Sequence, residues 1–285
     1  MNIRHLVLSS GSLNGINMVG ILYEALSKNV LKYENIKTIH GCSAGSIVLA
    51  LWLTKIKKED LYNFIINRPW DKTFNPSHNI INGLIMDKGI LDIEHFNKIL
   101  TPVFKAQEID PAITLMEFYK YTNIEFHIYS TDINTFNSVD FSYKTHPDLK
   151  LFNAIYMSSS IPFIFKPIYY NGTYYIDGGI SNRYPIQSCL DNGGEEDNIL
   201  GLKITRHGYN NLKEDCSIMT YGLHIVNMAV RKIMNFNFVD TKHQIDIQTV
   251  PIISIIDEIL SSSDKRKELL IDGENSFNEF LKSSV

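Results

Sequence analysis

The sequence predicts an α/β fold in which helices cover both faces of a parallel sheet. Two strand-helix units follow one another near the N-terminus, with residues 4–9 leading into 16–29 and residues 36–41 leading into 46–56. Their strand segments are almost continuously apolar, which is typical of parallel strands buried on both faces. With 285 residues, of which 44% are apolar, the chain can fill the core of one large domain.

The remaining elements follow from apolar spacing and from turn residues, taken in chain order. Helices are expected over 57–67, 92–100, 114–122, 149–157, 221–234 and 274–284. Strands are expected over 124–133 and 138–143, which would form a hairpin, over 169–177 with a turn at Asn171 and Gly172, and over 198–205 and 245–252. No repeat or linker divides the chain, so we expect a single domain over residues 1–285.

Residues 68–92 interrupt this rhythm of strands and helices. Pro69, Pro76, Gly83 and Gly89 separate apolar side chains that we expect to be exposed, namely Trp70, Phe74, Ile80, Ile81, Leu84, Ile85 and Met86. An irregular apolar insert of this kind predicts a lid, or a surface element under which a ligand binds.

The overall charge excludes a general attraction to polyanions. The formal net charge is -4, which gives no electrostatic pull toward nucleic acid or an anionic membrane. We therefore expect no nucleic-acid partner. Any peripheral contact with a membrane would be local and largely apolar.

The cysteines indicate a reducing environment. Cys42, Cys189 and Cys216 are odd in number and widely spaced, so they form neither a disulfide framework nor a metal-ligand cluster. We expect a cytoplasmic protein without a metal or another cofactor. No run approaches the roughly 18 apolar residues of a membrane span, and the apolar run near the N-terminus is too short for a secretory signal.

Ser43 is the first candidate for chemistry. It lies between Gly41 and Gly45 at a predicted turn from strand to helix. Glycines let the backbone turn sharply there, which would expose the serine oxygen near the N-terminal N–H groups of the helix. A serine hydroxyl is a weak nucleophile, so it needs a base and donors for the oxyanion that forms. The alternative is a tight turn with a capping serine.

Asp177 is the candidate partner of this serine. It ends a predicted strand and is followed by Gly178 and Gly179, which allow close approach of the backbone. Ligand sites in open α/β sheets lie at such strand ends. The alternative is an aspartate that opens a glycine-rich turn.

A histidine is a further alternative for the base. His40 lies close before Ser43, but a side chain so near on the incoming strand usually points elsewhere, and we expect it to be structural. A triad of the α/β-hydrolase type runs serine, acid, histidine along the chain, which leaves His207, His224 or His243 as the base. None of these lies in a turn of small residues, so this hypothesis is the less favoured one.

Other polar residues have simpler interpretations. Cys42 is expected to pack as a small apolar group, and Asp132 and Asp140 to stabilise turns or caps. The charged run over 261–268 predicts a solvated start of a helix.

Four stretches, in this order along the chain, resemble motifs of the patatin-like phospholipase family. Residues 10–15 align with its glycine-rich loop, and GCSAGS at 41–46 resembles its nucleophile motif. NAIYMSSSIPFIFKP at 153–167 resembles its segment of small residues and prolines. DGGISNRYP at 177–185 resembles its Asp-Gly-Gly motif. Together these stretches lie between about residues 5 and 190.

The resemblance implies a three-layer α/β/α sandwich with a mostly parallel central sheet. Residues 191–285 would complete this sandwich. It also implies a Ser-Asp dyad. In that arrangement Asp177 accepts the proton of Ser43, and the serine attacks an ester carbonyl of a phospholipid or a related acyl-ester lipid. A water molecule activated by the same aspartate then releases the fatty acid. The insert within 68–92 would contact the acyl chain or the bilayer surface.

The glycine-rich loop departs from the family pattern Gly-Gly-Gly-x-Arg/Lys-Gly. The chain has Ser10 and Ser12 in place of two glycines and Asn14 in place of the basic residue, while Gly11 and Gly15 remain. The resemblance implies that backbone N–H groups of the loop and of the residue after the nucleophile form the oxyanion hole, that is, those of Gly11, Ser12, Leu13 and Ala44. Two hypotheses follow. The first is a lipid acyl hydrolase, and the second is a catalytically weakened patatin fold that binds lipids or other partners.

Overall fold

A mostly parallel sheet forms the centre of the computed structural model, which describes residues 1–74, 80–206, 239–249 and 256–283, together with 212, 214–216, 221, 222, 224, 225 and 228. Over these residues the sheet has eight strands in the order β10-β9-β1-β2-β4-β8-β7, with β5 beside β4. The strands are β1 (His5–Leu8), β2 (Thr38–Cys42), β4 (Glu125–Asp132), β5 (Ser138–Phe141), β7 (Ile168–Tyr170), β8 (Thr173–Asp177), β9 (Ile199–Arg206) and β10 (His243–Thr249).

The sheet changes from parallel to antiparallel at β4. Strands β10, β9, β1, β2 and β4 run parallel to one another. The β4–β5 pair is antiparallel, which confirms the hairpin predicted there, and so are the β4–β8 and β7–β8 pairs. Asn171 and Gly172 join β7 to β8 with positive φ angles of 48° and 88°, as a two-residue hairpin turn requires. A second, small sheet pairs β3 (Gly89–Leu91) with β6 (Phe163–Phe165).

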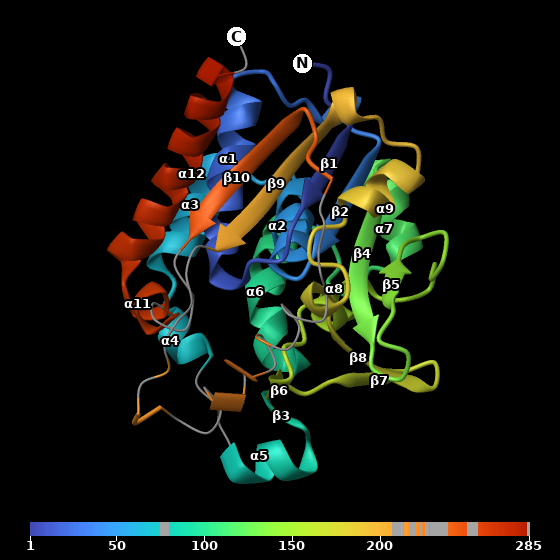
Figure 1. Cartoon of the computed structure of the whole chain (residues 1–285), viewed down its shortest axis with the longest axis vertical. Helices are drawn as coiled ribbons and strands as arrows, with labels where there is room; N and C mark the ends of the chain where they lie inside the picture. Colours follow the sequence, from blue (N-terminus) through green and yellow to red (C-terminus); the bar gives the residue numbers. More distant parts are fainter. Residues whose placement is uncertain are drawn as a thin grey trace.

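Helices lie on both faces of the large sheet (Figure 1). They are α1 (Gly15–Ser27), α2 (Ala44–Leu53), α3 (Lys58–Asn67), α4 (Trp70–Thr73), α5 (Ile80–Met86), α6 (Ile93–Ala106), α7 (Leu115–Thr122), α8 (Leu151–Ser158), α9 (Ile186–Asp191), α11 (Ile256–Ser261) and α12 (Ser263–Ser283), with short 3-10 turns η1 (Ser12–Asn14), η2 (Tyr33–Asn35), η3 (Gly178–Ile180) and η4 (Glu196–Asn198).

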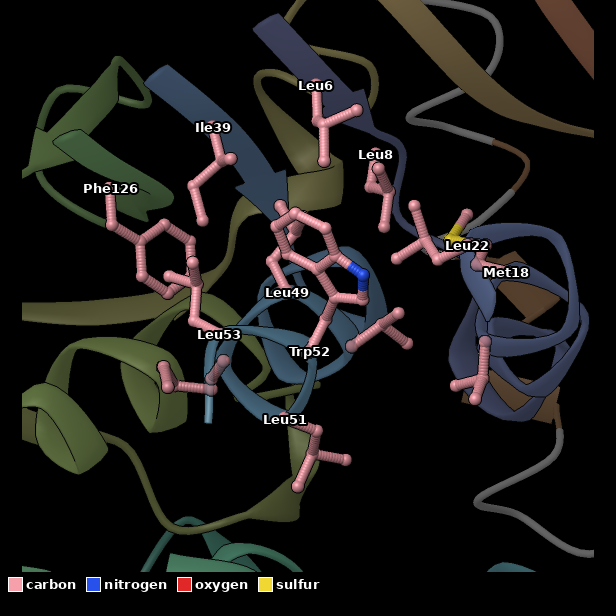
Figure 2. Packing of buried hydrophobic residues seen from close by; sticks show 14 of the residues in the cluster. Leu6, Leu8, Met18, Leu22, Ile39, Leu49, Leu51, Trp52, Leu53 and Phe126 are labelled. Atoms are coloured by element: carbon pink, nitrogen blue, oxygen red, sulfur yellow. The ribbon is translucent and has the colours of Figure 1, made fainter. Parts of the chain in front are cut away.

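Strand β1 shows how the two faces are filled. Leu6 and Leu8 join the large core that includes residues of α1, α2, α6, α8 and α12, whereas Val7 joins a small cluster with residues of α9. Alternate side chains therefore meet helices on opposite faces, as the pleat of a strand dictates. Figure 2 shows Trp52 of α2 in the large core, near Leu6 and Leu49. The predicted α/β/α sandwich is confirmed.

The C-terminal helix packs closely against the first helix. In Figure 1, α12 and α1 lie side by side although they are far apart in the sequence. A Cβ atom on Gly20 of α1 would collide with the carbonyl oxygen of Leu270, and one on Gly273 of α12 would collide with that of Asn17. The two helices can approach so closely because both positions lack a side chain. Helix α12 therefore packs directly against helix α1.

Several predictions differ from the structure or lie outside it. The insert at 68–92 contains α4, α5 and β3, and Trp70 is buried at 8% exposure rather than exposed. Strand β6 was not predicted, since three residues next to a proline carry little periodicity. Helix α12 begins at Ser263, well before the predicted 274. The helix predicted over 221–234 falls mostly outside the described residues.

Candidate active site

Ser43 lies on a sharp turn between β2 and α2. Its backbone has φ 51° and ψ -121°, a strained conformation for a residue with a side chain. A Cβ atom on Gly45 would lie 2.5 Å from the carbonyl oxygen of Leu8, and one on Gly41 would lie 2.8 Å from the Cα atom of Ser46. Both glycines are therefore needed for close backbone packing, as in the nucleophile elbow that the spacing predicted.

Asp177 meets this serine directly. The Oγ atom of Ser43 donates a hydrogen bond to the Oδ2 atom of Asp177 at 2.6 Å. Both residues are largely buried, at 5% and 8% exposure. The other carboxylate oxygen, Oδ1, accepts a hydrogen bond from the N–H of Gly179 at 2.7 Å. A Cβ atom on Gly179 would lie 2.9 Å from that oxygen. Glycine at this position therefore allows its backbone N–H to orient the carboxylate.

The backbone of Asp177 is fixed by the sheet and by the segment before it. The residue ends β8, where Asp177 stands opposite Ser130 of β4 in the antiparallel ladder. Its N–H donates to the carbonyl of Ser160 at 2.9 Å, and its own carbonyl accepts from Thr131 Oγ1 at 2.9 Å. These contacts place the carboxylate beside the elbow, because β2 pairs with residues 125–129 of β4 and β8 pairs with residues 130–132, so that Asp177 lies where β2 ends.

Ser158 links the elbow to the same strand. Its Oγ atom accepts a hydrogen bond from the N–H of Ser43 at 2.8 Å and donates one to the carbonyl of Tyr129 at 2.6 Å. Ser158 ends α8 and is completely buried. Sequence reasoning placed it in a family-like segment but gave it no role.

The loop after β1 lies against the start of α2. Ser12 has a positive φ of 51°, and the N–H of Ser10 donates to the carbonyl of Arg183 at 2.8 Å. A Cβ atom on Gly15 would lie 3.0 Å from the Cβ atom of Ala44. Within the described part of the chain, no group accepts a hydrogen bond from the backbone N–H of four residues, namely Gly11, Ser12, Leu13 and Ala44.

Asn14 occupies the place of the basic residue in that loop. It is buried, and its Nδ2 atom has no hydrogen-bond partner among the described residues. The position therefore holds a neutral amide inside the fold instead of a solvated cation.

An apolar pocket begins beside the elbow. Its lining comes from the glycine-rich loop and from α1, α2, α3, α4, α6, α11 and α12, through Ser12, Leu13, Gly15, Ile16, Val19, Ala44, Ile47, Val48, Leu51, Phe64, Ile65, Trp70, Phe74, Ile99, Ile259, Leu260 and Arg266. Sequence reasoning did not predict this pocket, because its residues are scattered along the chain and each resembles an ordinary core residue.

His40 is a structural residue, as expected. Its ring is buried and hydrogen-bonds to Thr38 Oγ1 at 3.0 Å and to the Tyr129 hydroxyl at 2.8 Å. It stacks on the ring of His127 with centroids 4.5 Å apart. Burial, and then the nearby rings of His127 and His5, hold the pKa of His40 well below its ordinary value. The ring therefore stays neutral.

The other histidines do not meet Ser43 in the described structure. His243 begins β10 and pairs with Leu200 near the start of β9, whereas Ser43 follows the end of β2. The two residues thus lie at opposite ends of the parallel strands. His224 is partly buried, and His207 lies outside the described residues.

The predictions for the remaining polar residues agree with the structure at Cys42 and Asp132 but not at Asp140. Cys42 is buried, and burial together with the neighbouring Asp177 raises the pKa of its thiol. Asp132 caps its turn by accepting from the N–H of Asn134 at 2.7 Å. Asp140 was predicted to stabilise a turn or a cap, but its side chain does not do so. It binds the Nδ1 atom of His127 at 2.7 Å instead, because β5 places it opposite Tyr129 at the edge of the buried histidine pair.

Metal-binding clusters and membrane-spanning helices are both absent from the described residues. No group of three or more His, Cys, Asp or Glu side chains there is arranged to hold a metal ion. No helix in the described ranges combines the length and the apolar character needed to cross a membrane.

The fold and the site define an α/β/α sandwich with a serine elbow facing an aspartate. Residues 6–190 match the patatin-like phospholipase family, and the chain belongs to this family. Over 185 residues the chain is 30% identical to "Probable lipid hydrolase 463L" of Invertebrate iridescent virus 6, in an alignment that covers 65% of the chain and 62% of that relative.

Two solved structures share the fold. VipD from Legionella pneumophila aligns with a TM-score of 0.58 and 14% identity, over 100% of the chain and 67% of VipD. The type III effector ExoU of Pseudomonas aeruginosa aligns with a TM-score of 0.52 and 12% identity, over 99% of the chain and 53% of ExoU. The chain therefore spans only about half to two thirds of these proteins.

Proposed function

We propose that the protein is a lipid acyl hydrolase that cleaves ester bonds of phospholipids or related glycerolipids with a dyad of Ser43 and Asp177. The observation that carries this proposal is the 2.6 Å hydrogen bond from the serine hydroxyl to the carboxylate. It supplies the base that a serine nucleophile needs within hydrogen-bond reach. Family membership, the hydrolase name of the viral relative and the apolar pocket beside the elbow support the lipid ester as the substrate class.

The proposed reaction has two halves. Ser43 attacks the ester carbonyl while Asp177 takes its proton, and the alkoxide of the lysolipid leaves with that proton as the acyl-serine forms. Asp177 then takes a proton from water, which attacks the acyl-serine and releases the fatty acid. The proton returns to the serine oxygen, so both residues end as they began.

Backbone N–H groups would stabilise the oxyanion in each half. Those of Gly11, Ser12, Leu13 and Ala44 have no acceptor among the described groups, and donation from the backbone needs no particular side chain. The replacement of glycine by Ser10 and Ser12 is therefore compatible with an oxyanion hole in this loop.

The second candidate is a catalytically weakened patatin fold that binds lipids or another partner. Asn14 favours it, because a buried neutral amide whose Nδ2 atom has no hydrogen-bond partner among the described residues replaces the family's cation. Labelling of the folded protein with a serine-directed fluorophosphonate separates the two candidates. An adduct at Ser43 supports the hydrolase, and a folded protein without the adduct supports the binding protein.

Hydrolysis of a short-chain ester tests the dyad itself. Changing Ser43→Ala and, separately, Asp177→Asn should each abolish hydrolysis while circular dichroism and the unfolding midpoint stay close to those of the parent. Cys42→Ala serves as the neighbouring control and should retain activity. Hydrolysis that persists in either dyad variant would exclude the proposed mechanism.

Peripheral contact with a membrane is part of the same proposal. Ile85 and Met86 at the end of α5 are 69% and 73% exposed, and Phe163 of β6 is 48% exposed. Strand β6 pairs with β3, which follows α5 directly, so these apolar side chains belong to neighbouring elements. Sedimentation with neutral phosphatidylcholine vesicles should fall in an Ile85→Ser, Met86→Ser variant and should be insensitive to salt, since apolar contact is not screened.

Location is the last part of the proposal. Cys42, Cys189 and Cys216 are all free thiols in the described structure, which supports the reducing cytoplasm as the compartment.

A further inference from the structure

The pocket beside Ser43 has two different sides. The side next to the elbow consists of the glycine-rich loop, the first turns of α1 and residues 44–51 of α2. The opposite side consists of α3, α4, α11 and the start of α12. Among the described residues of the lining, Arg266 alone is charged, and the residues from Ile259 onward lie beyond the stretch that matches the family.

Trp70 forms the rigid part of the opposite side. Its indole Nε1–H donates to the carbonyl of Ile65 at 2.8 Å. Phe64 packs against its ring edge-on, with centroids 5.4 Å apart, and Phe74 stacks on it at 6.1 Å. An indole held by a hydrogen bond and by two rings cannot move aside at low cost.

Arg266 of α12 links the elements on this opposite side of the pocket through hydrogen bonds. Its guanidinium donates to the carbonyls of Ile65 and Ile66 at the end of α3, at 2.9 Å and 2.6 Å, and to that of Ile259 in α11 at 2.7 Å. It also reaches the carbonyls of Leu260 and Arg68. The side chain is 4% exposed, so the prediction of a solvated helix start was wrong at this position. A cation is stable here because unpaired carbonyls at helix C-termini attract it.

The lining of the pocket along α2 is short. Along α2 the lining runs from Ala44 to Leu51, which corresponds to about 10 Å at the rise of an α-helix. One leaflet of a bilayer has about 15 Å of hydrocarbon. The part of the pocket that follows α2 is therefore shorter than a typical acyl chain of a membrane lipid.

We infer that the pocket is an acyl-chain subsite with a fixed length limit, set by Trp70 and held in place by Arg266. The inference rests on the proposed function for the position of the ester, and it adds that medium-length acyl chains fill the subsite. Methylenes beyond the limit stay outside and add no binding free energy. Trp70 is the specificity-determining residue, and Arg266 is a positioning residue.

Binding of fatty acids, the products of the proposed reaction, tests the subsite without catalysis. A series of saturated fatty acids of increasing length is titrated into the Ser43→Ala protein by calorimetry, below the critical micelle concentration of each. Affinity should rise about fourfold for each added methylene, as the burial of one CH₂ predicts, and should level off at medium length.

Two variants in the Ser43→Ala background move the limit in opposite directions. Trp70→Leu should shift the plateau to longer chains, and Ile47→Trp, which fills the pocket from α2, should shift it to shorter ones. Phe277→Leu in α12 reduces a buried ring that does not line the pocket, and it should leave the plateau unchanged.

The outcomes distinguish the two proposals. An affinity that ignores chain length, or a plateau that moves in neither pocket variant, overturns the acyl subsite even if the wild-type protein hydrolyses short esters. Chain-length-dependent binding in a protein whose wild type hydrolyses no ester supports the subsite and overturns the hydrolase.

Discussion

The N–H of Ser43 and the hydroxyl of Ser158 are joined by a 2.8 Å hydrogen bond, and the same hydroxyl donates to the carbonyl of Tyr129. The buried Ser158 hydroxyl thus accepts a hydrogen bond from the strained elbow and donates one to the neighbouring strand β4. Because the elbow's φ is positive, its geometry depends on surrounding contacts of this kind.

Replacing that hydroxyl should disturb the elbow. Ser158→Ala leaves the buried N–H of Ser43 without its acceptor, which costs about 1–3 kcal/mol, and ester hydrolysis should fall with little change in KM. Ser160→Ala is the matched control, because the hydroxyl of Ser160 donates back to the Tyr156 carbonyl of the preceding helix and not to the elbow. Equal kcat values for the two variants would argue against a positioning role.

Removal of the Arg266 guanidinium should lower stability strongly. Arg266→Met keeps much of the side-chain volume but leaves several buried carbonyls unpaired, at a cost of about 3 kcal/mol or more in the free energy of unfolding. Lys267→Met is the control, because Lys267 is exposed on the same helix and should change stability by less than about 0.5 kcal/mol. Urea denaturation measures both, and similar losses would mean that the carbonyl contacts contribute little.

The crossing of α1 and α12 should not accept a methyl group. Gly273→Ala places a Cβ atom against the carbonyl of Asn17, and overpacking of this kind costs about 1–3 kcal/mol despite the better helix propensity of alanine. Glu279→Ala, at an exposed position of α12, should be nearly neutral. A thermal unfolding midpoint that is higher for Gly273→Ala than for the parent would show that the helices can separate freely.

Stability should decrease as the solution becomes more acidic than about pH 6.5, the ordinary pKa of histidine. The pKa of His40 is lowered in the folded state, so the unfolded chain binds more protons as the pH falls and the folded state loses stability. The loss is up to about 1.4 kcal/mol per pH unit below that value for this one group.

His40→Gln removes this titrating group and keeps polar atoms for Thr38 and Tyr129. The slope of unfolding free energy against pH should become shallower in this variant below about pH 6.5, while His5, whose pKa is also lowered by burial, still contributes. An unchanged slope would show that His40 is already protonated in the folded protein.

The sequence alone predicted most of the sheet and the central pair of the site. Ser43 and Asp177, which the structure brings within hydrogen-bond distance, stand out because glycines lie on both sides of Ser43 and directly after Asp177, each at the end of a strand. This is a local signal with a steric cause. The hairpin at Asn171 and Gly172 was found for the same reason, since its turn needs residues that tolerate positive φ.

Other parts of the site have no local signal. Arg266 stands in a charged run that is typical of a solvated helix, and only the folded chain brings the ends of α3 and α11 to it. Trp70 follows a proline in an irregular segment, so its burial against Phe64 and Phe74 depends on tertiary packing. Such positions are determined by contacts between distant segments, which spacing along one segment does not record.

The antiparallel β8 strand supplies the carboxylate 134 residues after the serine, and this order has a consequence during synthesis. The ribosome releases the elbow long before it releases Asp177, so the growing chain carries the serine without its base. On the proposed mechanism, ester cleavage must wait until β8 has emerged and paired with β4. The order of the strands would thus delay activity until well over half of the 285 residues have been made. Nearby lipids would be protected from an unfinished enzyme in this way.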